Sequence, residues 1–414
     1  MARSKLRVTI GLDYGTHSVK CVLRTRHDDR AMLINFGAEI PNERYPWFAE
    51  PSVIRLLNGQ LWFGRKALEQ HDGELWRSLK MRLLDANGML LESNIPEAPL
   101  NVDVMIAAHI ANVLQRMNRM LEAKYGPSHE ILLSLNVGAP MNHFVNQDLH
   151  DRYLQIINAA WEISFGEHSM AVRNGVQVNE VVPLLCRLIH SPVPDKTQRK
   201  FEVLPETVAP IVSMAKDPSM DPGLYAMMDM GAGTTEMSVV FVADRSSEHR
   251  VSCYYDESHL VGGNDLSQTV PGNSHSNAPA IAENLRKLLV KITGRAFQHD
   301  SPNPVLREKW KTLNLLYTGG AARHPDIQAR CRLMTSEMKP YRIGESHFDC
   351  IWHSPQFAGC GDGLTESESS LLAVANGLSY NRMDWLIFYP PDELIPEVPV
   401  ERIEKPEAAW YLND

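Results

Sequence analysis

Apolar residues along this chain follow two periods, one typical of helices and one of strands. From Asn101 to Lys124 they recur at steps of three and four residues until Gly126-Pro127 ends the pattern, which predicts an amphipathic helix. A buried strand is expected over Glu130–Val137 and a second helix near Gln147–Ala160. This alternation predicts an α/β fold in which helices cover the faces of a mixed sheet.

Two segments repeat one pattern of strand, glycine turn and strand. In the first, an apolar run leads into Asp13-Tyr-Gly15-Thr16 and a second apolar run. In the second, the turn is Asp229-Met-Gly231-Ala232-Gly233-Thr234-Thr235. Glycine permits positive φ and leaves backbone N–H groups open to an anion such as phosphate. One such hairpin resembles an ordinary β-turn, but two at domain-scale spacing indicate a phosphate-binding protein.

A third glycine element, Gly319-Gly320, follows a predicted strand and opens a predicted helix that contains Pro325. The order of these three elements resembles the superfamily of actin, heat-shock chaperone and sugar-kinase ATPases, over roughly residues 6–380. The resemblance implies an actin-like fold with two lobes, each a mixed sheet flanked by helices. It further implies a duplicated ribonuclease-H-like core with the nucleotide in the interlobe cleft.

The resemblance and the changes in composition together predict the domain organisation. Lobe I is expected over 1–220 and 363–383, with 37–95 as a small subdomain and 161–200 as an insertion that begins with a hairpin over 161–178. Lobe II is expected over 221–362, with 261–311 as a reduced subdomain.

The last 31 residues, 384–414, read as a tail rich in proline and acidic residues. Because proline lacks a ladder donor, we expect this tail not to continue a sheet. Its aromatic residues are Trp385, Phe388, Tyr389, Trp410 and Tyr411. They are too many for an inert linker, and they predict docking on the chain itself or on a partner.

The resemblance assigns roles to the charged residues. Asp13 and Asp229 are expected to hold Mg²⁺ through its water shell, in keeping with the reluctance of this ion to lose water. The lysine on the γ-phosphate is either Lys20, at the position used by actins, or Lys80, at the position used by chaperones. Glu206, 23 residues before Asp229, is expected to orient the attacking water.

Two of these assignments have alternatives. Glu180 competes with Glu206, but it lies 49 residues before Asp229, further than the family interval. Glu283 and Lys287, expected on a helix, either reach the ribose or form a surface ion pair four residues apart.

The resemblance implies further nucleotide contacts on the hairpins and on three other elements. The full set of expected nucleotide-binding residues is Gly15, Thr16, His17, Lys20, Gly231, Ala232, Gly233, Thr234, Thr235, Gly262, Gly263, Glu283, Lys287, Gly319, Gly320 and Arg323. Among these, Arg323 would stack on adenine, a role that suits its planar guanidinium group.

The composition argues against a nucleic-acid-binding or membrane-spanning protein. A net charge of −9 and a pI near 6.0 give no basic surface for nucleic acid. No apolar run approaches the ~20 residues of a membrane span, and the N-terminal residues lack an apolar signal region. Six cysteines without a Cys-x-x-Cys pair suit reduced thiols in a cytoplasmic protein. The spacing of His347, Cys350, His353 and Cys360 does not suit a zinc site.

These observations predict a chaperone-like ATPase that binds Mg-ATP, hydrolyses it slowly and acts as a conformational switch for a protein partner. Too few residues follow Tyr380 for the chaperone's peptide-binding domain. One alternative is a self-associating, filament-forming ATPase of the plasmid-segregation type, favoured by Lys20 and the 161–178 hairpin. Another is a small-molecule kinase, and a third is a scaffold that does not hydrolyse ATP.

Overall fold

The computed structural model describes most of the chain and divides it into two units. The described residues are 4–27, 30–37, 45–83, 100–140, 146–215, 221, 223–242, 250–259, 262, 278–300, 312–321, 327, 329, 342–343, 346–347, 349–353, 364–381 and 387–389. Unit 1 comprises Met1–Ser213 and Phe357–Met383, and unit 2 comprises Met214–Gln356 and Asp384–Asp414. Each unit has its own sheet and its own hydrophobic core.

The sheet of unit 1 is built on the first glycine hairpin. Its strands are β1 (Ser4–Tyr14), β2 (Ser18–Thr25), β3 (Ala31–Leu33), β4 (Ala49–Pro51), β8 (His129–Ala139) and β10 (Phe201–Pro205). They follow the order β10-β8-β1-β2-β3, and β4 also pairs with β2. The β1–β2 and β2–β3 pairs are antiparallel, whereas β1–β8 and β8–β10 are parallel.

The sheet of unit 2 repeats this arrangement around the second glycine hairpin. Its strands are β11 (Gly223–Met230), β12 (Thr235–Val242), β13 (Arg250–His259), β14 (Thr312–Thr318), β17 (Asp349–His353) and β18 (Ile387–Tyr389). The order is β17-β14-β11-β12-β13-β18. Again the β11–β12 and β12–β13 pairs are antiparallel, and β11–β14 and β14–β17 are parallel. The predicted α/β class with mixed sheets is therefore confirmed.

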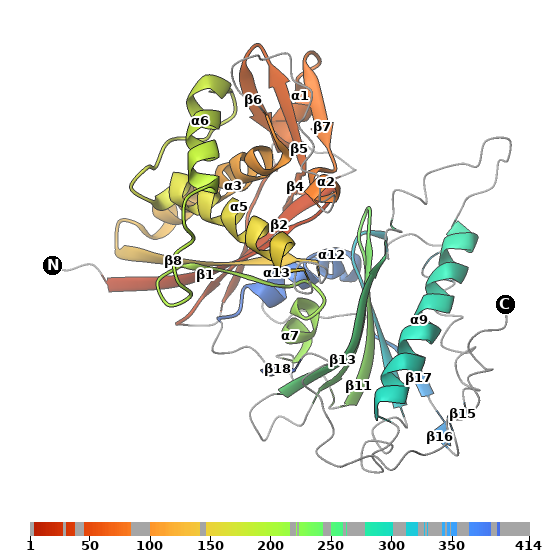
Figure 1. Cartoon of the computed structure of the whole chain (residues 1–414). Helices are drawn as coiled ribbons and strands as arrows, with labels where there is room; N and C mark the ends of the chain where they lie inside the picture. The colour runs from red at the N-terminus through yellow and green to blue at the C-terminus, as the bar shows by residue number, and fades with distance from the viewer. Residues whose placement is uncertain are drawn as a thin grey trace, which may run out of the picture. The chain divides into compact units, whose positions relative to one another are not determined.

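Helices cover these sheets (Figure 1). In unit 1, α3 (Val102–Tyr125) and α5 (Gln147–Phe165) pack on each other and on β8 and β10. In unit 2, α9 (Ala278–Asp300) packs along β12 and β13. The side chain of Asn101 accepts a hydrogen bond from the backbone N–H of Val104, which caps α3 where the sequence predicted its start.

The remaining elements of unit 1 form a small sheet and several short helices. The sheet has the order β7-β5-β6-β9, from β7 (Glu74–Arg77), β5 (Val53–Leu57), β6 (Gln60–Phe63) and β9 (Val176–Gln177). The helices are α1 (Gly64–Glu69), α2 (Leu79–Leu83), α6 (Val178–Ile189), α12 (Glu366–Leu371) and α13 (Ala373–Leu378). A further helix, α7 (Ala209–Ala215), begins in unit 1 and ends in unit 2. In unit 2, β15 (Arg342–Ile343) and β16 (Ser346–His347) pair with each other.

Two sequence-based predictions of local structure are wrong. No hairpin spans 161–178, because α5 continues to Phe165 and buries Ile163 in the helical register before Gly166 ends it. Part of the tail does continue a sheet, since β18 pairs in parallel with β13. That strand ends before Pro390, so its ladder loses no donor to proline. Residues 390–414 lie outside the described part of the chain.

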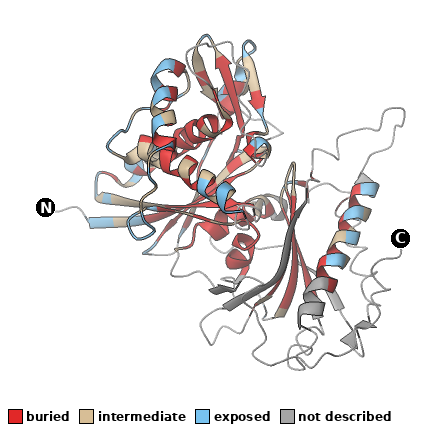
Figure 2. Ribbon diagram, viewed as in Figure 1, coloured by how far each residue is buried: buried red, intermediate tan, exposed pale blue. Residues whose placement is uncertain are grey.

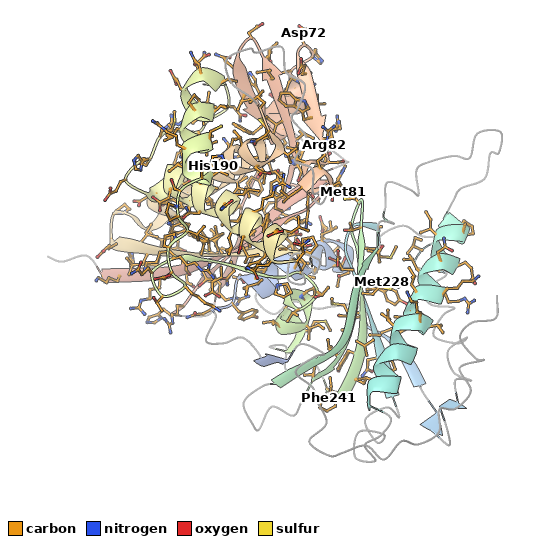
Figure 3. The ribbon with its side chains drawn as sticks, viewed as in Figure 1. Asp72, Met81, Arg82, His190, Met228 and Phe241 are labelled. Atoms are coloured by element: carbon orange, nitrogen blue, oxygen red, sulfur yellow. The ribbon has the colours of Figure 1, made fainter. Side chains whose placement is uncertain are left out.

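Burial increases along β1 and β8 toward their carboxyl ends. Figure 2 shows β1 and β8 exposed or partly exposed at their N-terminal ends and buried toward their carboxyl ends, where the first hairpin turns. In unit 2, Met228 of β11 (labelled in Figure 3) belongs to the core that β11 shares with Leu285 and Leu289 of α9. Asp72, also labelled, follows α1, and its carbonyl accepts a hydrogen bond of 2.9 Å from Arg55.

The core of unit 1 contains a neutral histidine. His109 of α3 is fully buried, with Nδ1 3.3 Å from the hydroxyl of Tyr14 and its ring stacked on Phe63. Burial, and next the charge of Arg116, lower the pKa of His109 to about 3 from an ordinary 6.5. Below pH 6.5 the unfolded chain therefore binds a proton that the folded chain does not, so stability falls as the pH falls.

We expect this histidine to contribute to acid sensitivity. Between pH 7.5 and pH 5.0 it should reduce the free energy of unfolding by about 2 kcal/mol. The free energy of unfolding of His109→Gln should fall by about that much less over the same pH interval. Urea unfolding at the two pH values measures the difference. An equal loss in both proteins would show that His109 does not cause the sensitivity.

Candidate functional site

The first hairpin brings Lys20 onto Asp13. The two residues lie opposite each other across β1 and β2, so their side chains share one face of the sheet. Lys20 Nζ donates to Asp13 Oδ2 at 2.5 Å, and only 6% of Asp13 is exposed. The direction of the Lys20 side chain, which alternation alone left open, is therefore toward the carboxylate at the base of the turn.

The turn of this hairpin is held by the segment that follows β4. Ser52 Oγ donates to the carbonyl of Gly15 at 2.6 Å, and the Ser52 N–H donates to the carbonyl of His17 at 2.9 Å. The ring of His17 stacks on Tyr45 at 4.7 Å, and Thr16 is buried. The turn is thus supported from outside its own hairpin, which fixes the backbone groups that would meet an anion.

Lys80 and Glu206 form a second ion pair in unit 1. Lys80 comes from α2, and Glu206 follows β10, where its backbone N–H donates to the carbonyl of Ala139 at 3.0 Å. Both side chains are buried. Gly138 lies against the Glu206 side chain so closely that a Cβ there would be 2.7 Å from Cγ. Glu180, the alternative carboxylate, is instead exposed on α6.

Tyr153 is a buried residue beside Gly138 that the sequence reasoning missed. Its hydroxyl donates to the carbonyl of Gly138 at 3.2 Å, and the side chain is buried on α5. Burial raises the pKa of Tyr153 well above its usual value, and the charges of Glu206 and Asp13 raise it further. Glu206 and Asp13 therefore both act on one buried phenol, although they lie 193 residues apart in the sequence.

The second hairpin surrounds Asp229 with other polar groups. Across β11 and its neighbours, Asp229 lies opposite Glu236 on β12 and opposite Thr318 on β14. Thr318 Oγ1 donates to Asp229 Oδ1 at 2.9 Å, and Glu236 is 2% exposed. The sequence reasoning missed both neighbours. One signal for Glu236 was present, because it follows Asp229 by the seven residues that separate Lys20 from Asp13.

The glycine loops of unit 2 lie close to this hairpin. The N–H of Gly231 donates to the carbonyl of Thr234 at 2.9 Å, and Thr235 is buried. Gly262 packs so closely on the peptide of Ala232 and Gly233 that a Cβ there would be 2.7 Å from it. Gly319 has a φ of +90°, and its missing Cβ would lie 2.4 Å from Asp229 Oδ1.

The other residues expected to contact the nucleotide pair elsewhere, are exposed or lie outside the described residues. Glu283 pairs with Arg286 at 2.5 Å, three residues on, rather than with Lys287, which is exposed. Gly320 is exposed. Gly263 and Arg323 lie outside the described residues, as does Cys360 of the rejected zinc set.

The donors around the two aspartates suit a hydrated divalent cation. Within the described part of the chain, no three His, Cys, Asp or Glu residues gather as a metal-binding group. Asp13 offers a single carboxylate, and Asp229 has one further carboxylate, Glu236, opposite it. Mg²⁺ prefers oxygen ligands and keeps several of its waters, so few carboxylates of this kind fit it better than they fit Zn²⁺.

Comparison with models of known protein families and with curated proteins finds no match for this chain. Of the helices that the structure describes, none combines the length and apolar character needed to cross a membrane.

Proposed function

We propose that this chain is an ATPase with the two-lobed actin-like fold, closest to the nucleotide-binding domain of heat-shock chaperones. The observation that carries the proposal is the repeat of one sheet topology in both units, with an aspartate at the same end of the first strand each time. Three antiparallel strands followed by two parallel ones are the pattern of a duplicated ribonuclease-H-like core. Two unrelated glycine turns would not be expected to share it.

In this proposal the acidic residues of the hairpins hold hydrated Mg²⁺. Asp13 and Asp229 are the principal ligands of its water shell, and Glu236 adds negative charge beside Asp229. Magnesium bound there would neutralise charge on the phosphate oxygens. Thr318, by donating to Asp229 Oδ1, holds the orientation of this carboxylate.

The two lysines are proposed to bind phosphoryl oxygens, and Glu206 to orient the attacking water. Lys20 and Lys80 are both within unit 1, and each contacts a carboxylate that the proposal assigns to the nucleotide site. The contact between Lys80 and Glu206 puts a cation beside a base, the two groups needed for charge stabilisation and water activation in phosphoryl transfer. Gly138 permits this contact because it has no side chain to displace Glu206.

We propose that nucleotide turnover switches the conformation recognised by a protein partner. The filament-forming alternative loses one of its supports, because the 161–178 segment is not a hairpin. Nothing in the sequence marks the substrate pocket that the kinase alternative would need.

The experiment that tests the proposal is phosphate release from Mg-ATP by the full chain, without any added acceptor. We expect slow, magnesium-dependent release and no ATP-dependent pelleting. Release that requires a small-molecule acceptor would favour a kinase, and sedimentation with ATP would favour a filament. No turnover under any of these conditions would contradict the proposal.

A further inference from the structure

Glu50 lies beside the first hairpin, although no role has been assigned to it so far. It is the middle residue of β4, which pairs with β2 so that Ala49 lies opposite Lys20 and Glu50 opposite Val19. Ser52, two residues later, makes the two hydrogen bonds to the turn. The segment 49–52 therefore runs along the hairpin from the phosphate-binding lysine to the turn itself.

The Glu50 carboxylate is buried between two arginines from different helices. Its exposed fraction is 1%. Arg116 of α3 donates to Oε1 at 2.6 Å, and Nε of Arg65 of α1 lies 3.9 Å from Oε2. Gly64, at the start of α1, has a φ of +58°, and a Cβ there would be 2.0 Å from Glu50 Oε1. A side chain at Gly64 would therefore exclude the carboxylate from its place.

The two arginines also bind the backbone that leads into β4. Arg65 Nη2 donates to the carbonyls of Tyr45, Pro46 and Ala49 at 3.0, 2.7 and 3.1 Å. Arg116 Nη2 donates to the carbonyl of Phe36 at 3.2 Å. Glu50 thus keeps two guanidinium groups together, and these fasten β4 and the loop before it to α1 and α3.

Among the described residues, the contact between Glu50 and Arg65 lacks a direct hydrogen bond. Glu50 Oε2 and Arg65 Nε are both buried, and neither has a hydrogen-bond partner there. They lie 3.9 Å apart, as an ion pair without a direct hydrogen bond. Removing the Glu50 charge would leave the two arginines to repel each other in a buried place, which is strongly destabilising.

We propose that Glu50 is a positioning residue for the first hairpin, which through β4 holds Lys20 and the Gly15 turn in the geometry that receives phosphate. The nature of the ligand rests on the proposed function, whereas the ordering of the hairpin does not. Glu50 touches no ligand in this account. It acts through Arg65, Arg116 and the β4 backbone.

The test is Glu50→Gln in the full chain, followed by hydrogen exchange of the hairpin amides and by ATP titration. We expect exchange at the amides of Gly15 and Ser52 to accelerate about tenfold or more, since local opening becomes easier. The amide of Gly231 in the second hairpin should exchange as in the wild type. The dissociation constant for Mg-ATP should rise about tenfold.

The matched control is Asp103→Asn, which breaks another ion pair of α3, to Arg152 at 2.7 Å. It should lower stability without accelerating exchange at Gly15.

A second variant is needed if Glu50→Gln does not fold. Glu50→Gln combined with Arg116→Met preserves the net charge of the cluster and should still loosen the turn. Unchanged hairpin exchange, or faster exchange with unchanged ATP affinity, would overturn the proposal. If the wild type binds no ATP, the proposed function fails, and the exchange data alone decide the role of Glu50.

Discussion

Replacing Asp13 or Asp229 with asparagine is expected to reduce ATP hydrolysis by more than ~10²-fold. Each substitution keeps the shape of the side chain but removes one anion from the proposed magnesium site. In Asp229→Asn the new amide oxygen can still accept the hydrogen bond from Thr318, so a loss at this position reports the charge rather than the geometry. Phosphate release at saturating Mg-ATP is the measurement.

The control for both variants is Asp151→Asn, which removes an exposed carboxylate on α5 that accepts a hydrogen bond from Gln147. It should retain wild-type turnover. Wild-type turnover in either Asp13→Asn or Asp229→Asn would show that the hairpins do not hold the catalytic metal.

Replacing Glu206 with glutamine is expected to slow hydrolysis by ~10²-fold while changing ATP affinity little. The glutamine cannot accept a proton from the attacking water, whereas the cation of Lys80, proposed to bind the phosphate, is retained. Single-turnover hydrolysis separates this effect from binding.

Lys80→Met should instead weaken ATP binding and hydrolysis together, because the lost cation would contact the phosphate both in bound ATP and in the transition state.

Glu180→Gln is the matched control, since Glu180 is the competing carboxylate and is exposed on α6. We expect it to behave as the wild type. If Glu180→Gln slows turnover and Glu206→Gln does not, the water-orienting residue has been assigned to the wrong carboxylate.

Local patterns predicted the elements of this fold well where one segment determines its own structure. The helix from Asn101 follows from its apolar period and its cap, and both hairpins follow from their apolar runs and glycine turns. The prediction failed at 161–178, because Gly166 ends a helix there rather than turning a hairpin. It failed in the tail because a short strand precedes the prolines.

The candidate site was only partly accessible from the sequence. Asp13, Asp229 and Glu206 were predicted from motifs, spacing and the family resemblance. Thr318 was missed because its contact with Asp229 depends on the parallel register between β11 and β14, which lie 89 residues apart at this point. Tyr153 and Gly138 were missed for the same reason, since their role depends on how α5 and β8 meet Glu206.

The central claim is that the chain binds Mg-ATP and needs both Asp13 and Asp229 to do so, and calorimetric titration of ATP into the full chain tests it most directly. We predict one site per chain, tighter binding with magnesium than with chelator, and weakening of that binding by Asp13→Asn and by Asp229→Asn alike. Absence of binding at millimolar ATP, or binding that ignores magnesium and both substitutions, would contradict the account.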